Sequence, residues 1–525
     1  MSPQEGTEVY LLGGGIASLA AAVYLIRDAQ VPGRNIHILS EERLGGSLDA
    51  SGSSELGYSM RGSRMFGAAY VHTYDLLAQI PSLDEPDISV LDDTLDFWKS
   101  TPWHAKARLI DNGEVADLSS WGLSDKDRLD LLRLMLFAEN LLGAKRIDEC
   151  FAAHFFTTNF WMLWASMFGF ETWHSAAELR RYLLRLLRFF PDLETLKLIV
   201  STRYNGYDSI VRPLVKWLQH HGVQAETDVQ VLDLDFAAGN EGKRVRRIAC
   251  LRHGKLDSIE IEDTDLVIAT LGSMTADSSL GSMTQAPVLK TEKTNGCWAF
   301  WQRLAEKDRE FGNPLSFCGH IDQTKWVTFT VTDSGDAFAH RMEQLSSSKP
   351  GRGGLVTVKN SSWRLTFHLY HPPAYPDQPE GVFVWWGYGL LPDQTGDYVN
   401  KKMSECNGTE ILVEVFSHLR FQRDTPTFLK TANCIPCMLP YTTSQFMPRP
   451  HGSRPAVVPK GTVNLAFVGQ YCEIPDDIAY TIEYSIHSAY LAVTALLGIP
   501  NNMPPTYKGL EHPYALVSAL KRILN

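Results

Sequence analysis

The sequence of 525 residues has few cysteines and no excess of basic residues. Its eight cysteines are scattered, which excludes a small disulfide-stapled scaffold. Lys and Arg total 49 against 60 Asp and Glu, which gives a formal net charge of −11. Because a nucleic-acid binder needs a basic face that releases counterions, this balance excludes a general nucleic-acid-binding protein. It also argues against broad electrostatic docking on anionic lipid.

Long hydrophobic runs, internal repeats and low-complexity segments are missing as well. The stretch from Val9 to Ile26 is apolar but is interrupted by three consecutive glycines, and Phe160 to Phe170 is too short to span a bilayer. The start of the chain carries Glu5 and no basic residue, which is unlike a secretory signal. We therefore expect a cytoplasmic protein with reduced thiols.

A glycine-rich turn follows the first apolar segment. Residues 8–12 have the composition of a buried parallel strand, and Leu19 to Ile26 has that of a helix. Between them, Gly13 allows a tight turn, Gly15 lets the backbone approach a pyrophosphate, and Ser18 takes the place of the third glycine of a dinucleotide fingerprint. A structural glycine turn is the alternative.

The residues after the second strand, Asn35 to Leu39, indicate which dinucleotide binds. An acidic residue there accepts the ribose hydroxyls, and we expect Glu41, with Ser40 and Glu42 as neighbouring alternatives. Gly45, Gly46 and Ser47 form a second glycine turn, which favours FAD over NAD. A late strand ending in Val468, Gly469 and Gln470 fits a flavin-contacting strand of the same class.

The remaining pattern predicts an α/β fold. It has an FAD-binding Rossmann-like domain of the two-dinucleotide type, an inserted substrate domain and a helical C-terminal part. The predicted helices are 124–147, 176–190, 481–497 and 514–524, and the predicted strands lie in 222–270, 325–333, 354–370 and 463–468, with a proline-rich loop at 430–460. Arg180, Arg181, Arg185 and Arg188 are expected on a solvated helix side.

The length predicts about three domains. We expect the FAD domain in 1–125, 206–300 and 455–500, a helical substrate or lid region in 126–205, a substrate-binding domain in 301–454 and a helical tail in 501–525. Lys521 and Arg522 beside Leu520 and Leu524 would allow the tail to contact a membrane peripherally, and packing on the body is the alternative. No feature specifies an oligomeric state.

Many segments resemble one family over nearly the whole chain. They are Gly13 to Ala22, Arg61 to Arg64, Tyr74 to Leu76, Ile80 to Leu83, Ala105 to Asp111, Trp173 to Ala176 with Arg181 and Tyr182, Arg203 to Ser209, Gly272 to Thr275, Phe311 to Pro314, Pro440 to Arg449 and Asn464 to Gln470. In this order they resemble the oleate hydratases, also called the myosin-cross-reactive antigen family.

The resemblance implies FAD-dependent hydration of a cis double bond in a free unsaturated fatty acid, of the oleate or linoleate type, with no net redox change. One group must protonate an alkene carbon while another steers water onto its neighbour. The family's proton-donating Tyr maps onto Tyr182. The alternative for Tyr182 is a core tyrosine with a satisfied hydroxyl.

The family's water-orienting Glu is absent. Aligning Arg61 to Arg64 with the family motif places Met65 at the position of this Glu, and the family's later His and Glu fall on Ala69 and Val71. A methionine neither accepts a proton nor holds water strongly. Water activation must then come from a backbone carbonyl, the flavin or His72, or else the activity has changed.

The resemblance and the glycine turns together predict two further sets of contacts. The expected cofactor residues are Gly13, Gly15, Ala17, Ser18, Glu41, Gly46, Ser47, Arg64, Phe66, Val229, Gly272, Ser273, Gly469 and Gln470. Thr442, Thr443, Ser444 and Gln445 are expected to meet the fatty-acid carboxylate, or else to satisfy the backbone of a turn.

Aromatic residues gather just before Tyr182. Phe155, Phe156, Phe160, Trp161, Trp164, Phe168, Phe170 and Trp173 are expected to wall an acyl tunnel, with core packing as the alternative. Cys434 and Cys437 have no partner motif that would make a zinc site, and we expect no metal. A flavin-dependent lipid oxidoreductase or isomerase, or a non-catalytic fatty-acid-binding flavoprotein, remain as alternative functions.

Overall fold

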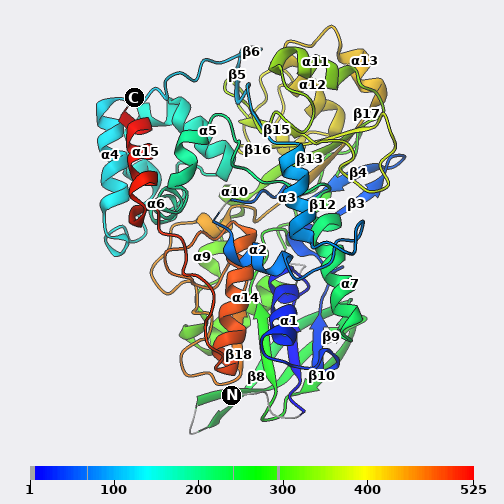
Figure 1. The fold of residues 1–525 in the computed structure, drawn as a ribbon, viewed down its shortest axis with the longest axis vertical. Helices are drawn as coiled ribbons and strands as arrows, with labels where there is room; N and C mark the ends of the chain where they lie inside the picture. The colour runs from blue at the N-terminus through cyan, green and yellow to red at the C-terminus, as the bar shows by residue number, and fades with distance from the viewer. Residues whose placement is uncertain (1–5, 68, 240–241, 293–295, 525) are drawn as a thin grey trace.

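The computed structural model describes residues 6–67, 69–239, 242–292 and 296–524. A parallel sheet with the strand order β18-β11-β1-β2-β7 forms the lower half of the molecule (Figure 1). Its strands are β1 (Val9–Leu12), β2 (Ile36–Leu39), β7 (Gln224–Glu226), β11 (Leu266–Thr270) and β18 (Leu465–Val468). The inner strands are almost entirely apolar and buried, as a sheet covered on both faces requires.

Helices from both ends of the chain cover this sheet. Helix α1 (Ile16–Arg27) lies beside α14 (Ile482–Leu497), and α7 (Arg212–His220) lies next to α1 (Figure 1). An antiparallel sheet of β8 (Val229–Gly239), β9 (Gly242–Arg252) and β10 (Lys255–Glu260) packs against α8 (Gly296–Lys307) through β8. The predicted α/β fold and the strand–turn–helix–strand unit at its start are confirmed.

A larger sheet occupies the upper half of the molecule, with the order β12-β17-β13-β16-β15-β14-β5-β6. Its strands are β5 (Leu109–Asp111), β6 (Glu114–Val115), β12 (Ser279–Leu280), β13 (Trp326–Asp333), β14 (Val356–Val358), β15 (Leu365–Leu369), β16 (Phe383–Gly389) and β17 (Ala432–Leu439). Helices α11 (Ala337–Ser346), α12 (Gly408–His418) and α13 (Thr425–Thr431) pack on it through Phe338, Phe416 and Phe428 (Figure 1).

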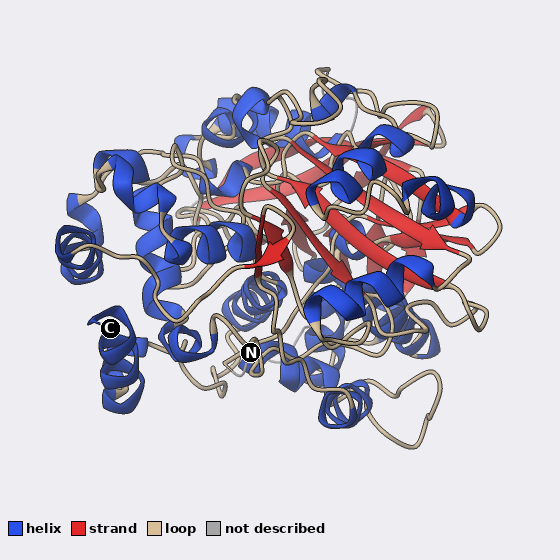
Figure 2. Ribbon diagram, turned by 90° about the horizontal axis from the view of Figure 1, so that it is seen from above, coloured by secondary structure: helices blue, strands red, loops and turns tan. Residues whose placement is uncertain are grey.

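A helical region lies beside this sheet and includes the C-terminal helix (Figures 1 and 2). It contains α4 (Asp125–Leu136), α5 (Asn159–Phe168), α6 (Ala176–Arg185) and α15 (Pro513–Leu524). Helix α15 packs on the 3-10 helix Leu187–Asp192 and leaves Tyr514 and Val517 exposed. No helix of the described residues combines the length and apolarity needed to cross a membrane.

Short elements connect these parts. A hairpin of β3 (Ala50–Ser53) and β4 (Gly57–Met60) leads to the loop that contains Met65, and α2 (Val71–Leu77) and α3 (Val90–Ser100) follow it. Helices α9 (Leu315–Cys318) and α10 (Ile321–Thr324) precede β13. Residues of the first 125 thus serve both sheets, because β1 and β2 belong to the parallel one and β5 and β6 to the larger one.

Two predicted helices are shorter than expected. The helix predicted over 124–147 begins at its expected cap, where the Ser124 hydroxyl accepts a hydrogen bond from the Asp127 N–H, but it ends at Leu136. Phe137 and Ala138 are extended, and Glu139 lies in a separate 3-10 turn where it pairs with Arg181. The helix predicted over 176–190 is α-helical only to Arg185 and continues as a 3-10 helix.

The loop predicted over 430–460 is wrong in its first part, which is strand β17 in the interior of the larger sheet. The prolines of this segment are the reason that a loop was expected. Pro436 nonetheless fits the strand, because it lies beyond the residues that β12 pairs with, and its carbonyl still accepts a hydrogen bond from the Gly281 N–H.

Candidate functional site

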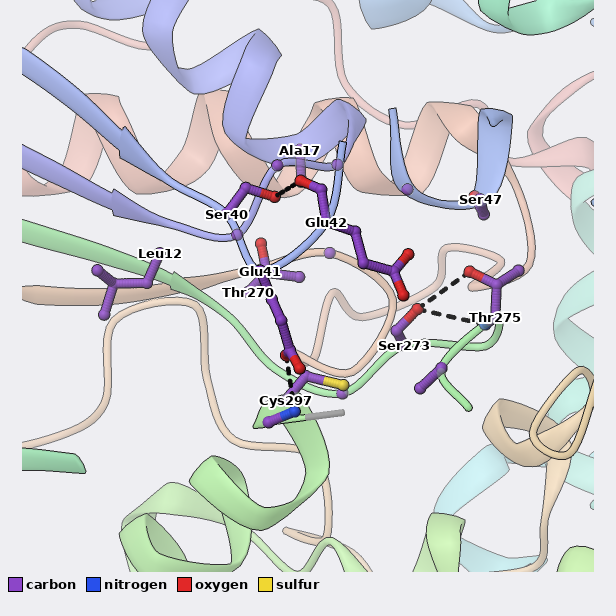
Figure 3. Close-up of a pocket in the computed structure, with 18 of the residues that line it drawn as sticks. Leu12, Ala17, Ser40, Glu41, Glu42, Ser47, Thr270, Ser273, Thr275 and Cys297 are labelled. Carbon is purple, nitrogen blue, oxygen red and sulfur yellow. Dashed lines mark hydrogen bonds between the residues drawn. The ribbon is translucent and has the colours of Figure 1, made fainter. Parts of the chain in front are cut away.

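The largest cavity described lies at the carboxyl ends of the parallel strands, where Leu12, Leu39 and Thr270 reach its wall (Figure 3). It holds about 1140 Å³ of space not filled by protein atoms, including the part open to solvent. Eleven of the predicted cofactor residues line it: Gly13, Gly15, Ala17, Glu41, Gly46, Ser47, Val229, Gly272, Ser273, Gly469 and Gln470. Crevices at this edge of an open α/β sheet are the usual ligand sites of such folds.

The three glycines of the first turn meet different surroundings. A Cβ on Gly13 would lie 3.0 Å from Thr270 Oγ1, and one on Gly14 would lie 2.4 Å from Ser40 Oγ. A Cβ on Gly15 would meet no protein atom within 4 Å. Gly15 is also the N-cap of α1 and supplies no side-chain cap, so the first N–H groups of this helix remain available to an anion in the cavity.

Ser18 lies outside this cavity. Its Oγ is 3.2 Å from Thr270 Oγ1, so it joins α1 to β11 at the position where the fingerprint requires close packing.

Glu41 projects into the cavity from the end of β2 (Figure 3). Its carboxylate accepts hydrogen bonds from the Gly296 N–H at 2.8 Å and from Gln230 Nε2 at 3.0 Å. Burial raises the pKa of Glu41, and these two donors act in the opposite direction. The neighbouring Glu42 also lines the cavity, but its carboxylate pairs with Arg61 Nη2 at 2.9 Å.

A second cavity of about 660 Å³ contains Tyr182 and Met65. Its lining is Ser63, Arg64, Met65, Phe66, Gly67, Tyr70, Met167, Phe168, Tyr182, Leu186, Phe189, Ile199, Tyr480, Thr481 and Ile482. Among the described lining residues there is no carboxylate. The side chain at position 65 therefore shares a mostly apolar chamber with Tyr182.

The Tyr182 ring is packed between aromatic side chains. The ring centres of Phe170, Phe168 and Phe446 lie 5.0, 5.4 and 5.5 Å away. Its hydroxyl oxygen accepts a hydrogen bond from the Tyr480 N–H at 3.3 Å. Burial raises the pKa of Tyr182 well above that of a free phenol, with Tyr70 the next contributor. Tyr182 is therefore a neutral phenol at physiological pH.

Arg64 lies where the cavities meet. It lines the Tyr182 cavity, and its Nη2 donates to the carbonyl of Ser47 at 3.3 Å and lies 3.8 Å from Met274 Sδ. Ser47 and Met274 both line the large cavity. No carboxylate of the described residues contacts this guanidinium, and burial lowers its pKa. Arg64 thus flanks the large cavity from the Tyr182 side without lining it, whereas Phe66 lines the Tyr182 cavity only.

A third, polar cavity of about 440 Å³ shares Ser63 and Arg64 with the Tyr182 cavity. Arg203, Tyr370 and His371 also line it. Arg203 is fixed by Asp93, whose Oδ1 lies 2.8 Å from Nη2. Burial, followed by the charges of Arg352 and Arg203, lowers the pKa of His371.

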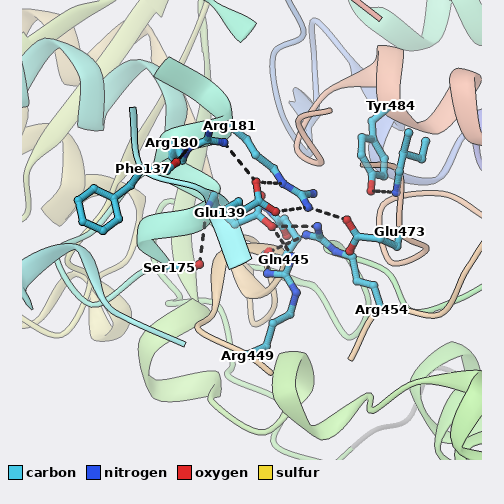
Figure 4. A network of polar contacts seen from close by, with 12 residues as sticks. Phe137, Glu139, Ser175, Arg180, Arg181, Gln445, Arg449, Arg454, Glu473 and Tyr484 are labelled. Atoms are coloured by element: carbon cyan, nitrogen blue, oxygen red, sulfur yellow. Dashed lines mark hydrogen bonds and ion pairs between the residues drawn. The ribbon is translucent and has the colours of Figure 1, made fainter. Parts of the chain in front are cut away.

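Arg181 and Arg185 of α6 do not lie on a solvated side, contrary to the prediction, whereas Arg188 beyond the helix is exposed as expected. Arg181 is buried, and its Nη2 donates to Glu139 Oε1 and to Glu473 Oε1, both at 2.7 Å (Figure 4). Arg185 is also buried and pairs with Asp477. Burial of these charges requires partners, and carboxylates from distant segments supply them.

Glu178, one turn before Tyr182, belongs to the same ion network. It pairs with Arg449 and with Arg454, whose Nη1 is 2.9 Å from Oε1. Burial alone would raise the pKa of Glu178, but the arginines lower it to about 2. The network joins α6 to the loops at 449–454 and 473, so it fixes the helix that carries Tyr182.

Thr442, Thr443, Ser444 and Gln445 line none of these three cavities. All four are buried, and their side chains hold a turn: Ser444 Oγ donates to the Tyr441 carbonyl at 2.9 Å, and Gln445 Nε2 donates to the Thr442 carbonyl at 3.0 Å. The turn alternative accounts for these contacts. The carboxylate site expected at these four residues stays a prediction.

His72 is also occupied elsewhere. Its Nδ1 lies 3.0 Å from Glu483 Oε1, and its ring stacks on His487 at 4.0 Å. It lines none of the three cavities. Of the eight aromatic residues before Tyr182, Phe168 lines its cavity, whereas Phe155, Trp161 and Trp164 are core residues of the helical region.

Cys434, Cys437 and one group of two carboxylates with a histidine do not line the three cavities. Cys434 and Cys437 are free and buried on β17, and burial raises the pKa of both thiols. Asp397, Glu414 and His418 approach one another within 4.8 Å, but the carboxylate of Glu414 already accepts hydrogen bonds from three backbone N–H groups at residues 397–399.

Several cavity residues were not found by reading the sequence. Cys297 and Met274 line the large cavity, and Tyr70 and Tyr480 line the cavity of Tyr182. Tyr70 follows the Met65 loop directly and Tyr480 directly precedes α14, so adjacency to a motif was the available signal.

Comparison with known proteins places the chain in a family. A sequence model described as the MCRA family matches residues 6–494. The chain belongs to the MCRA family. It is 36% identical over 524 residues to an oleate hydratase of Streptococcus pyogenes, covering 98% of this chain and 88% of that protein. It is 28% identical to a linoleate hydratase of Lactiplantibacillus plantarum, covering 99% of each chain.

Solved structures support the fold of this MCRA family member. A putrescine oxidase bound to putrescine has a TM-score of 0.54 at 9% identity, and the cyclohexylamine oxidase of Brevibacterium oxydans has a TM-score of 0.53 at 11% identity. Each match covers 94% of this chain and 99% of the other. At such low identity the likeness concerns the fold alone.

Proposed function

We propose that this protein hydrates a cis double bond of a free unsaturated fatty acid to give a hydroxy fatty acid, with no net redox change. The observation that carries the proposal is the buried, neutral phenol of Tyr182 in an apolar chamber that meets the large cavity at Arg64. Two relatives that match over most of their length are an oleate hydratase and a linoleate hydratase. Both the site and the relatives thus support the same reaction class.

The large cavity fits FAD. The open space at Gly15 and the N–H groups at the start of α1 suit a pyrophosphate. The carboxylate of Glu41, which follows the next strand, suits the hydroxyls of a ribose. Gly13, Gly15, Ala17, Glu41, Gly46, Ser47, Val229, Gly272, Ser273, Gly469 and Gln470 would hold it. Bound FAD would supply a polarised wall next to the alkene and no electron transfer.

Tyr182 would act as the acid. Its raised pKa keeps it protonated, so it has a proton to donate to one alkene carbon. The phenolate that then develops keeps the hydrogen bond from the Tyr480 N–H, and a fixed backbone dipole in a water-poor site stabilises such charge. The aromatic packing around its ring holds the hydroxyl in place.

The polar cavity would receive the fatty-acid carboxylate. Arg64 and Arg203 supply cationic donors, and Tyr370 and His371 add polar groups. Because this cavity shares Ser63 and Arg64 with the chamber of Tyr182, a carboxylate there can continue into an acyl chain beside Tyr182. Guanidinium groups are well suited to bind a carboxylate.

Product analysis tests the proposal. Purified, FAD-loaded protein incubated with oleate or linoleate under reducing conditions should give a fatty acid heavier by one water. A shifted double bond without added oxygen, or lasting flavin bleaching, would instead identify an isomerase or oxidoreductase. Met65 favours one further alternative, a fatty-acid-binding protein without activity, which would bind oleate and give no product.

A further inference from the structure

The chamber of Tyr182 has few groups that can hold the attacking water. Met65 offers none, and the described lining contains no carboxylate. The polar side chains that remain are Ser63, Arg64, Tyr70, Tyr480 and Thr481. One of these must replace the missing Glu if the chamber performs a hydration.

Three of the five are committed to other contacts. Thr481 caps α14, because its Oγ1 accepts from the Tyr484 N–H and donates to the Ile478 carbonyl at 3.0 Å. Ser63 is engaged with Tyr370 at the polar cavity, and Arg64 is a donor without acceptor atoms.

Tyr480 lies toward Arg64. The charge of Arg64 acts on the Tyr480 hydroxyl and lowers its pKa against the effect of burial, and the backbone N–H of Tyr480 serves the oxygen of Tyr182. Tyr70, in contrast, is the ionisable neighbour with the largest effect on Tyr182. The side chains of Tyr70 and Tyr182 both line this chamber, which Met65 also faces.

Tyr70 is held rigidly with its hydroxyl uncommitted. Its N–H donates to the Gly67 carbonyl at 3.1 Å, and Arg185 Nη2 donates to the carbonyl of Ala69 at 3.1 Å. No hydrogen bond within the described ranges engages the Tyr70 hydroxyl. Arg185 Nη1 is buried and unpartnered, so a cation lies close to the segment that places Tyr70.

We propose that Tyr70 holds the attacking water in place of the missing carboxylate and passes the water's proton to Tyr182. This inference rests on the proposed hydration. Tyr182 gives its proton to one alkene carbon and becomes a phenolate. The water oxygen forms a bond to the other carbon and releases a proton to the Tyr70 oxygen, while Tyr70 gives its own proton to the Tyr182 phenolate. H and OH have then added across the double bond, and both phenols are restored.

The test combines loss and rescue of this function. In Tyr70→Phe we expect kcat for oleate hydration to fall by about 100-fold while KM and FAD content hold, as for the loss of a group that transfers protons. Adding Met65→Glu to Tyr70→Phe should raise kcat again by at least about tenfold, because a carboxylate is a stronger base than a phenol. The rescued enzyme should lose activity in acid as the new Glu is protonated, unlike the wild type.

Tyr74→Phe is the matched control, because Tyr74 lies one turn along α2, the helix that Tyr70 caps, packs on Phe66 and lines none of the three cavities. It should keep wild-type kcat. Retained activity in Tyr70→Phe, or a loss that Met65→Glu fails to rescue, would overturn this inference alone. Absence of product with the wild type would overturn the proposed function and this inference together.

Discussion

The raised pKa of Tyr182 keeps its hydroxyl protonated but makes it a weaker acid, so the hydrogen bond from the Tyr480 N–H is needed to stabilise the phenolate that forms. No carboxylate competes for its proton among the described residues that line its chamber. The chemistry at this residue therefore depends on two properties that a substitution can separate, its hydroxyl and its aromatic ring.

Tyr182→Phe removes the hydroxyl and keeps the ring packed on Phe170 and Phe446. We expect kcat to fall by about 100-fold or more, since general acid catalysis contributes a factor of that order. FAD content should be unchanged. The Tyr480 N–H would lose its acceptor, which costs about 1–3 kcal/mol of stability and should appear as a modest drop in the unfolding temperature. Near-normal turnover would remove Tyr182 from the mechanism.

Gly15→Ala and Gly14→Ala form a pair that separates cofactor binding from folding. A Cβ at Gly15 enters space free of protein atoms, and its φ of −80° suits alanine, so the variant should fold normally and bind FAD weakly. A Cβ at Gly14 would overlap Ser40 Oγ, so that variant should lose stability. Flavin absorbance after gel filtration and thermal unfolding measure the two effects. Wild-type FAD binding by Gly15→Ala would place the cofactor elsewhere.

At the scale of elements, α6 is held by buried ion pairs as well as by its apolar face. Glu178 pairs with arginines in the loop at 449–454, which comes after β17, and Arg181 pairs with Glu473, which comes after β18 (Figure 4). Buried ion pairs of this kind are costly to break from one side, because the remaining charge is left unpaired. The helix that carries Tyr182 should therefore be sensitive to pH through its partners.

The pKa of Glu178 determines in which direction stability changes with pH. Its pKa is about 2 in the folded protein, against an ordinary value of 4.5 for a glutamate in the unfolded chain. The carboxylate therefore stabilises the fold above the higher value, and this stability is lost as pH falls toward the lower one. Glu178→Gln should lower the unfolding temperature at pH 7 and reduce its dependence on pH between these two values. Parallel curves for variant and wild type in thermal unfolding across this range would contradict the assignment.

The sequence predicted those elements that the residues within each segment determine by themselves. The unit from β1 through α1 to β2 follows from an apolar strand, a glycine turn and an Ala- and Leu-rich helix. The end of α4 does not follow from local pattern, because Glu139 pairs with Arg181, which lies far along the chain. Strand β17 was missed because Pro436 fits it only where the short strand β12 ends, and the sequence does not show where β12 ends.

At the scale of the whole molecule, the site is an assembly of distant segments. The loop at 63–70, helix α6 and the start of α14 meet around Tyr182, and Arg64 connects their chamber to the two other cavities. The glycine turns and the family resemblance predicted which residues face the large cavity. They did not predict Tyr70 beside Tyr182 or the polar cavity, because those contacts depend on packing between segments with no common pattern.

The most direct test of the hydration is an isotope experiment on the FAD-loaded wild type. Oleate is incubated in D₂O enriched in ¹⁸O, and the product is analysed by mass spectrometry with fragmentation. Hydration predicts a hydroxy fatty acid with one ¹⁸O in its hydroxyl and one deuterium on the adjacent carbon, with the flavin in its starting oxidation state. A hydroxyl without ¹⁸O, a displaced double bond, or no hydroxy acid from either oleate or linoleate would contradict it.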